Sequence, residues 1–416
     1  MSHGEPSSVA LQDGTSQSGT GDDRQAAPGS PEEQKVTWLE LFFDLTFVVA
    51  FDQLAKRLGD APSGINLVNF LVMFGAVWWA WAGNTTFAAR HGNQDRVYRW
   101  GSLAQLLTVA VLALSERGEL AENGPVFALA FAANRAVLIG MHALMIRRDP
   151  EVAAFARPLM TGYGLAALIW LGSAFLGGTA QLLAWGVALG VDLLTPLLLR
   201  DRHGQALPHQ EHLPERVGLL QIIALGGVVT ELVAGGRQRP LTPADLAPSL
   251  LALVTALGLW RLYFDQARAL PVLEAHRRGR IGSFLLWLYS HIPLTLGIVM
   301  LAVGMGHGIA DTENARDAVN LQLVVWSLAT ALLALALLRA NALRLSHRPL
   351  LNRSLLALLG GVGVSALLSL TDLGTLPLHA AVAALTVLLA AVSAADPTSE
   401  ALGEVEERLG AGGSPI

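Results

Sequence analysis

The feature that most constrains this chain is a series of apolar stretches, each about 18–24 residues long, separated by short polar segments. An α-helix of that length crosses the roughly 30 Å hydrocarbon core of a bilayer. Of the 416 residues, 52% are hydrophobic and 15% are charged, whereas a soluble domain carries about 25% charged residues. We therefore predict an all-α fold, a polytopic membrane helix bundle with about 12 transmembrane helices.

The predicted spans differ in their spacing and in their polarity. The fifth and sixth spans, like the eleventh and twelfth, are separated by very short loops, so each pair is expected to form a tight hairpin. The first span is unusual because it contains three carboxylates. The predicted spans are 37–55, 65–87, 99–115, 124–146, 158–176, 180–199, 214–234, 246–268, 281–305, 319–340, 350–371 and 377–394.

Both ends of the chain are polar. Residues 1–35 are rich in Ser, Gly, Pro and acidic residues, with few hydrophobic ones, and such a segment buries too little surface to become ordered. It lacks the basic and short apolar regions of a signal peptide, so we expect a disordered cytoplasmic tail. Residues 396–416 are predicted to form a polar C-terminal tail with a short amphipathic helix around Glu400–Leu409.

The basic residues are unevenly divided between the loops, and cytoplasmic loops carry the Lys/Arg excess. Loops after odd-numbered spans hold six: Lys56, Arg57, Arg117, Arg237, Arg239 and Arg316. Loops after even-numbered spans hold fifteen: Arg90, Arg96, Arg99, Arg147, Arg148, Arg157, Arg200, Arg202, Arg268, Arg277, Arg278, Arg280, Arg339, Arg344 and Arg348. Both termini are therefore predicted to be cytoplasmic. The preference for Arg over Lys is typical of a GC-rich bacterium.

Two pairs of segments indicate an internal repeat. The sequence YRWGSLAQLL at Tyr98–Leu107 resembles GRIGSFLLWL at Gly279–Leu288, and the RPL sequences at Arg157 and Arg348 begin the fifth and eleventh spans. Six spans per repeat is an even number, so the two repeats share one orientation, as in some transporters. Chance similarity between Leu- and Ala-rich helices is the alternative. The predicted halves are residues 36–200 and 201–395.

Charged residues inside the predicted spans form the candidate site. Each costs about 2.5–3.5 kcal/mol near the bilayer centre, so such groups usually face the bundle interior and often have a function. Glu40 and Asp44 are four residues apart and share a helical face, where they require a basic partner or a shared proton. We expect Arg135 and Arg216 to be counter-ions for the carboxylates of the first and sixth spans. A helix-packing ion pair is the alternative for any single residue. The predicted intramembrane polar site comprises Glu40, Asp44, Arg135, Asp192, Glu215, Arg216 and His291.

Several kinds of chemistry receive no support. Cysteine is absent, which excludes disulfides, thiol catalysis and thiolate-bound metals. No nucleotide-binding or hydrolase motif occurs in a suitable context, so we predict no catalytic, cofactor or metal site and no nucleic-acid partner. The expected partners are the lipid bilayer and a small solute or ion, and the sequence does not indicate an oligomeric state. The WWAW sequence at Trp78–Trp81 can stack a ligand, but an aromatic belt at the membrane interface accounts for it more simply.

The segment TWLELFFDLTFVVAFDQLA, which begins at Thr37, resembles the opening signature of the bacterial low temperature requirement protein A family. The resemblance continues through WWAWAGNTTFAARHGNQDR, HLPERVGLLQIIALGGVV, LWRLYFD and YSHIPLTLGIVMLAVG, and covers about residues 36–395. Gly227 departs from the family pattern, which has an acidic residue there, while Glu231 lies one turn later. Arg261 also replaces a family Trp. The resemblance implies an integral plasma-membrane protein and no particular biochemical activity.

Three functions remain open from the sequence. The duplicated six-span unit and the interior carboxylates favour a secondary transporter or ion-coupled permease. An ion channel is the second hypothesis, since a Phe-Asp pair in the first helix is similar to a potassium-channel signature. The third is a membrane-embedded enzyme or accessory factor of envelope or lipid metabolism, in which the polar groups act on a lipid.

Overall fold

The computed structural model describes residues 34–60, 63–116, 120–236, 243–310 and 318–410, which are almost entirely helical. The predicted tail at residues 1–35 lies outside this range except for its last two residues. The long helices of the first part of the chain are α1 (Trp38–Asp60), α2 (Gly64–His91), α3 (Arg96–Ser115), α4 (Leu120–Arg148), α5 (Ala153–Ser173) and α6 (Gly178–Leu198), with the short 3-10 helices η1 (Pro150–Val152) and η2 (Arg200–Gln205). The second part contains α7 (His212–Gly236), α8 (Pro243–Gln266), α9 (Leu270–Arg278), α10 (Ile281–Ala310), α11 (Ala318–Leu345), α12 (Arg353–Leu368), α13 (Thr375–Ala394) and α14 (Pro397–Gly410).

The predicted all-α membrane bundle is confirmed, because 10 helices of the described residues are long and apolar enough to cross a membrane. These are α2–α8, α10, α11 and α13. Each predicted span coincides with one helix. The helices of two predicted spans do not meet the same criteria: α1 carries four carboxylates, and α12 has 16 residues, fewer than the roughly 20 that a spanning helix needs.

Side chains at the loops define where several helices begin. The Ser63 hydroxyl accepts a hydrogen bond from the Asn66 amide at the start of α2, and the Asp95 carboxylate accepts one from the Tyr98 amide at the start of α3. Thr37 and Glu40 form a reciprocal capping box at the start of α1. These bonds satisfy amide groups that have no partner within the helix. They also fix the first turn of α1, where the candidate site begins.

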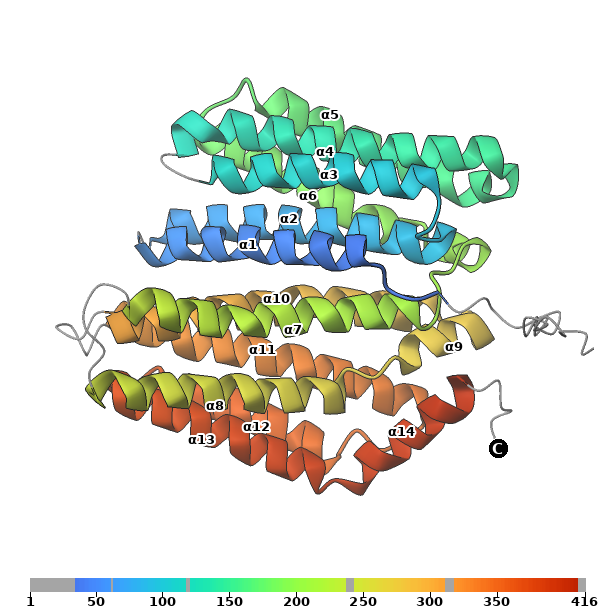
Figure 1. Cartoon of the computed structure of the whole chain (residues 1–416). Coiled ribbons are helices and arrows are strands. Elements are labelled where there is room, and N and C mark those ends of the chain that lie inside the picture. Colours follow the sequence, from blue (N-terminus) through green and yellow to red (C-terminus); the bar gives the residue numbers. More distant parts are fainter. Residues whose placement is uncertain (1–33, 61–62, 117–119, 237–242, 311–317, 411–416) are drawn as a thin grey trace, which may run out of the picture. The chain divides into compact units, whose positions relative to one another are not determined.

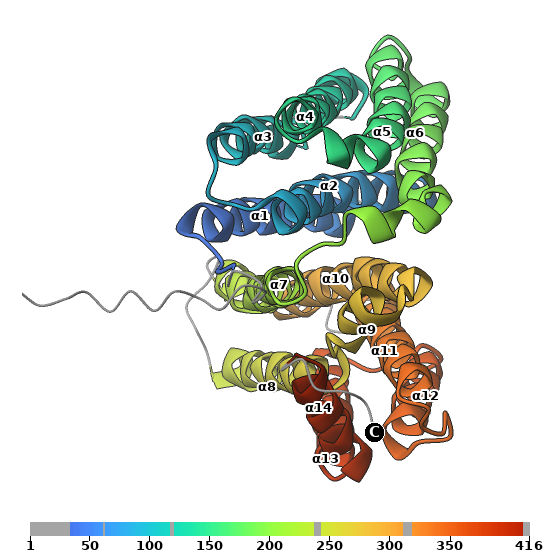
Figure 2. The same ribbon diagram turned by 90° about the vertical axis from the view of Figure 1, so that its right-hand side faces the viewer.

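Helices α1 and α2 pack against α7 and α10 at the middle of the bundle, as two perpendicular views show (Figure 1) (Figure 2). Helices α3–α6 lie on the far side of α1 and α2, and α8 and α11–α13 lie on the far side of α7 and α10. Leu107, Leu168 and Leu367 expose about two thirds of their surface. Exposed leucines on the outer helices are expected where lipid surrounds the bundle.

Two helices lie apart from the apolar spans. Helix α9, which the sequence interpretation missed, buries Leu270, Val272 and Leu273 and packs on α10, α11 and α14. The helix expected around Glu400–Leu409 is present as α14 and confirms that prediction. Charged residues between the apolar ones in both segments give an amphipathic helix rather than a membrane span.

A polar junction ties the C-terminal part to the bundle. The Asp396 carboxylate, between α13 and α14, accepts hydrogen bonds from Ser354 Oγ at 2.6 Å, Asn352 Nδ2 at 2.7 Å and the Thr398 amide at 3.0 Å. Arg339 Nη2 of α11 lies 3.1 Å from the same carboxylate. Burial alone would raise the pKa of Asp396, but these donors outweigh it and hold the pKa below its usual value.

Candidate functional site

Arg216 of α7 lies against two carboxylates of α1. Its Nη1 is 2.7 Å from Glu40 Oε1, while its Nη2 and Nε are 2.6 Å and 3.0 Å from the two oxygens of Asp44. All three side chains are completely buried. The four-residue spacing on α1 directs both carboxylates to the same side, and the planar guanidinium binds one oxygen of Glu40 and both of Asp44. The three residues form a closed ionic triad at the contact of α1 with α7.

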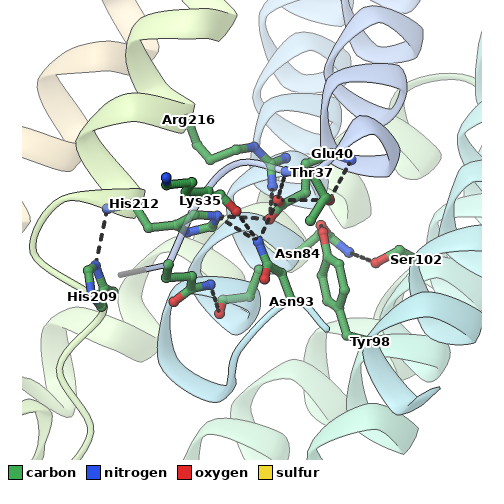
Figure 3. A network of polar contacts seen from close by, with 12 residues as sticks. Lys35, Thr37, Glu40, Asn84, Asn93, Tyr98, Ser102, His209, His212 and Arg216 are labelled. Carbon is green, nitrogen blue, oxygen red and sulfur yellow. Dashed lines mark hydrogen bonds and ion pairs between the residues drawn. The ribbon is translucent and has the colours of Figure 1, made fainter. Parts of the chain in front are cut away.

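Further donors surround Glu40 at the end of the bundle (Figure 3). Its Oε2 accepts hydrogen bonds from the Thr37 amide and from Asn93 Nδ2, both at 2.8 Å. His212 Nε2 lies 3.0 Å from Glu40 Oε1. Asn93 also donates to the Lys35 carbonyl at 2.8 Å, so the α2–α3 loop connects the segment before α1 with the first turn of α7. Glu40 thus has partners from three parts of the chain.

Two tryptophans of α2 continue the polar contacts into the bundle. Trp81 Nε1 donates to Asp44 Oδ1 at 2.7 Å, and Trp78 Nε1 donates to Thr295 Oγ1 of α10 at 3.2 Å. Both indoles are fully buried. The expectation that Trp78–Trp81 forms an interfacial belt is therefore wrong. Helix α2 has neighbours on both sides, and the indole N–H groups of Trp78 and Trp81 have acceptors within that core.

Arg135 and Asp192 form a second buried pair, between α4 and α6. Arg135 Nε lies 3.2 Å from Asp192 Oδ2, and both side chains are completely buried. The guanidinium carbon also lies 4.8 Å and 5.2 Å from the ring centres of Phe131 and Tyr163, at cation–π distance. None of the Arg135 nitrogens has a hydrogen-bond partner of suitable geometry among the described residues.

The other two predicted site residues belong to neither ionic group. Glu215 is exposed, because the adjacent Arg216 occupies the side of α7 that faces α1. His291 is buried, with Nδ1 2.8 Å from the Trp287 carbonyl and Nε2 3.4 Å from the Tyr263 hydroxyl. The seven predicted residues are therefore arranged as one triad, one pair and two separate side chains.

Glu231, which lies one turn after the family departure at Gly227, is near the opposite end of α7 from Arg216. Glu231 Oε1 is 2.9 Å from Lys56 Nζ, and Lys56 Nζ is 2.8 Å from Asp52 Oδ2. Fifteen residues separate Arg216 from Glu231, about 22 Å along a helix. Glu231 thus belongs to a cluster with Lys56 and Asp52 and does not contact the triad. A Cβ at Gly227 would meet nothing within 4 Å.

Sequence reasoning missed most of the neutral partners of the triad, namely Thr37, Trp81, Asn93 and His212. The Thr37–Glu40 capping-box spacing was a readable signal. The other partners come from segments far apart in the chain, such as Asn93 and His212, which are 119 residues apart. The sequence alone does not show that such segments meet in space. Within the described part of the chain, no group of three or more His, Asp or Glu residues is arranged to hold a metal ion.

The chain is similar to known proteins at the level of sequence. It is 29% identical over 297 residues to an uncharacterized protein of Rhizobium meliloti (strain 1021), which covers 67% of this chain and 71% of the relative. No solved structure matches it. The model of the bacterial low temperature requirement A protein family matches residues 35–394. The chain is therefore a multi-span membrane protein that belongs to the bacterial low temperature requirement A family.

Proposed function

We propose that this protein is an ion-coupled secondary transporter in which Glu40, Asp44 and Arg216 form the coupling site. The observation that carries the proposal is the burial of three ionisable side chains at the contact between α1 and α7. Buried ion pairs stabilise less than apolar packing of equal volume. Charged groups inside a membrane bundle therefore often mark ion or proton pathways rather than stability.

The charge balance of the triad supports proton coupling. Two carboxylates face one guanidinium, so the ionised triad carries one net negative charge when His212 is neutral. One added proton, on a carboxylate or on His212, makes the group neutral. Because an uncompensated buried charge is costly, proton binding and release would favour different packings of α1 against α7. A carrier that uses one proton per cycle needs such a dependence.

We propose twelve spans, which adds α1 and α12 to the ten apolar helices. Three of the four carboxylates of α1 have a cationic partner: Arg216 of α7 binds the buried Glu40 and Asp44, and Lys56 of α1 itself binds the partly exposed Asp52. Helix α12 packs between α11 and α13. A short helix of this kind can be accommodated by local thinning of the bilayer.

The packing pattern supports two parallel six-helix halves, residues 36–200 and 201–395. If α1–α6 correspond to α7, α8, α10, α11, α12 and α13, most neighbours in the first half have counterparts in the second. The contacts α3–α4, α4–α5 and α5–α6 match α10–α11, α11–α12 and α12–α13. The contacts α1–α3 and α2–α6 match α7–α10 and α8–α13. In this arrangement the triad joins the first helices of the two halves.

We propose that both termini are cytoplasmic. The support is the Arg and Lys distribution, with fifteen basic residues in loops on one side and six on the other. Helices α1 and α7 then both begin at the cytoplasmic face, and the triad lies within their first two turns. In this orientation Glu40 is nearest the cytoplasm and Asp44 is one turn deeper.

The test uses purified protein in proteoliposomes loaded with a pH-sensitive dye. Defined amino acids, organic acids, sugars and polyamines are added one class at a time, and proton movement is recorded. We expect one class to drive proton flux in the wild type. Glu40→Gln and Asp44→Asn should lose this coupling while inserting normally. Glu215→Gln removes an exposed carboxylate beside Arg216 and serves as the matched control.

Two outcomes would count against this function. Wild-type coupling in both Glu40→Gln and Asp44→Asn would show that the triad only holds helices together. Solute-independent currents in planar bilayers would instead identify a channel. A changed lipid profile in a deletion strain, without any solute-dependent flux, would favour the envelope-metabolism alternative.

A further inference from the structure

A small cavity lies between helices of the first part of the chain and α10, and none of the triad residues lines it. It is bounded by α2, α5, α6, η2 and α10 and holds about 20 Å³ of free space, room for about one water molecule or an ion of similar size. Apolar side chains of α5 and α10 form much of its wall. Its polar boundary includes Arg90, Thr86, Tyr163 and His203.

A second cation lies directly behind this wall. Arg135 Nη1 is 3.1 Å from the position that a Cβ of Gly83 would occupy, and Gly83 lines the cavity. The Tyr163 ring, which also lines the cavity, lies under the Arg135 guanidinium. Because residue 83 is a glycine, that position places no side chain between the guanidinium and the cavity; Leu138 Cδ2 is the nearer neighbour there, at 2.7 Å from the same Cβ position, and Arg135 itself lies behind the lining residues. The buried Arg135 guanidinium therefore lies close to the cavity at Gly83.

The Arg135 guanidinium has more donor capacity than its neighbours use. Asp192 approaches only through Nε, at 3.2 Å, and the nitrogens Nη1 and Nη2 have no hydrogen-bond partner among the described residues. Leaving a buried charged donor unpaired costs several kcal/mol, more than for a neutral group. A guanidinium in this position therefore needs an additional acceptor.

The charges around the cavity favour a negatively charged acceptor. Burial, and next the nearby Arg90, lower the pKa of His203 to about 3, so this histidine is neutral at pH 7. Arg90 and Arg135 contribute two positive charges, and Asp192 contributes one negative charge. The group as a whole therefore has one uncompensated positive charge. Arg90 donates to the Ala206 carbonyl at 2.9 Å, which is a neutral acceptor.

We propose that this cavity binds a small monovalent anion between Arg90 and Arg135. The volume fits a halide or the carboxylate of formate, and the charge of the anion balances the uncompensated cation. Arg90 at the end of α2 is the entrance group, and Arg135 is the deeper group. The proposal concerns binding and does not depend on the transport function of the triad.

The test measures thermal unfolding of the purified protein in detergent as sodium gluconate is replaced by sodium chloride or sodium formate at constant sodium concentration. A saturable rise of the unfolding temperature with chloride or formate is expected, because a ligand bound only to the folded state stabilises it. Arg135→Gln should weaken the apparent affinity about tenfold or more, as expected for the loss of a charged hydrogen-bond donor. Leu288→Phe, which fills the cavity without altering charge, should have a similar effect.

The matched control is Arg157→Gln, which removes the same charge from an exposed position on α5 and should bind as the wild type does. If Arg135→Gln does not fold, the test is whether Leu288→Phe weakens the anion-dependent rise of the unfolding temperature relative to the wild type. Equal unfolding temperatures in gluconate, chloride and formate would overturn the proposal. So would a saturable anion effect that survives unchanged in Leu288→Phe, because the anion would then bind elsewhere.

Discussion

Replacing Arg216 with methionine removes one charge from the triad while keeping much of the length of the side chain. Glu40 and Asp44 then remain fully buried, with oxygens that had been 2.6–2.7 Å from the guanidinium. Breaking one buried ion pair by removing a partner costs about 3–5 kcal/mol. Arg216 has two partners, so we expect the free energy of unfolding to fall by about 5 kcal/mol, the upper end of that range.

The measurement is equilibrium unfolding in mixed detergent micelles, followed by tryptophan fluorescence. Adding Glu40→Gln and Asp44→Asn to Arg216→Met should recover more than half of the loss, because the remaining groups are then neutral and can share hydrogen bonds. Arg157→Met is the control for loss of an exposed charge. The reasoning is refuted if Arg216→Met unfolds like the wild type, or if the neutral triple variant is no more stable than Arg216→Met alone.

Two other substitutions each alter the hydrogen bonds of one carboxylate, Asp44 or Asp396. Trp81→Phe removes the indole donor 2.7 Å from Asp44 Oδ1 and should lower the free energy of unfolding by about 1.5–3 kcal/mol; a change below about 0.5 kcal/mol would contradict the geometry. The pKa of Asp396 is lower in the folded protein than in the unfolded chain, whose value is about 3.9. Its contribution is therefore present above that pH and is lost as the pH falls through the folded-state pKa. Asp396→Asn should destabilise the protein at pH 7 and flatten this acid dependence in unfolding titrations, whereas parallel pH profiles for the two proteins would exclude the effect.

The positions of the helices followed from the sequence because each span is a long apolar stretch with polar ends. Lipid offers no hydrogen bonds to the backbone, so such a stretch can only be helical. The charged residues were informative for the same reason. Arg216 and Arg135 each had to meet a carboxylate inside the bundle, and the structure pairs Arg216 with Glu40 and Asp44, and Arg135 with Asp192.

The orientation of each helix about its own axis was harder to predict from the sequence. Glu215 and Arg216 are adjacent, so their side chains point about 100° apart on a helix, and only one of them faces α1. The charges alone predicted Arg216 as the counter-ion, but they did not show that Glu215, which was also expected in the site, would face away from α1. Trp78 and Trp81 had the same ambiguity, because a helix that is apolar on every side has no preferred face toward water. Helix α9 was missed because it is short and lies outside the apolar stretches.

The partnership of α1 with Arg216 also affects how the protein is made. Asp44 leaves the ribosome 172 residues before its counter-ion, which at about 5–20 residues per second is an interval of roughly 10–35 s. During that time α1 holds carboxylates whose insertion costs about 2.5–3.5 kcal/mol each at bilayer depth. The buried contact of α1 with α7 can therefore form only after Arg216 has been synthesised, and until then α1 carries Glu40 and Asp44 without their counter-ion.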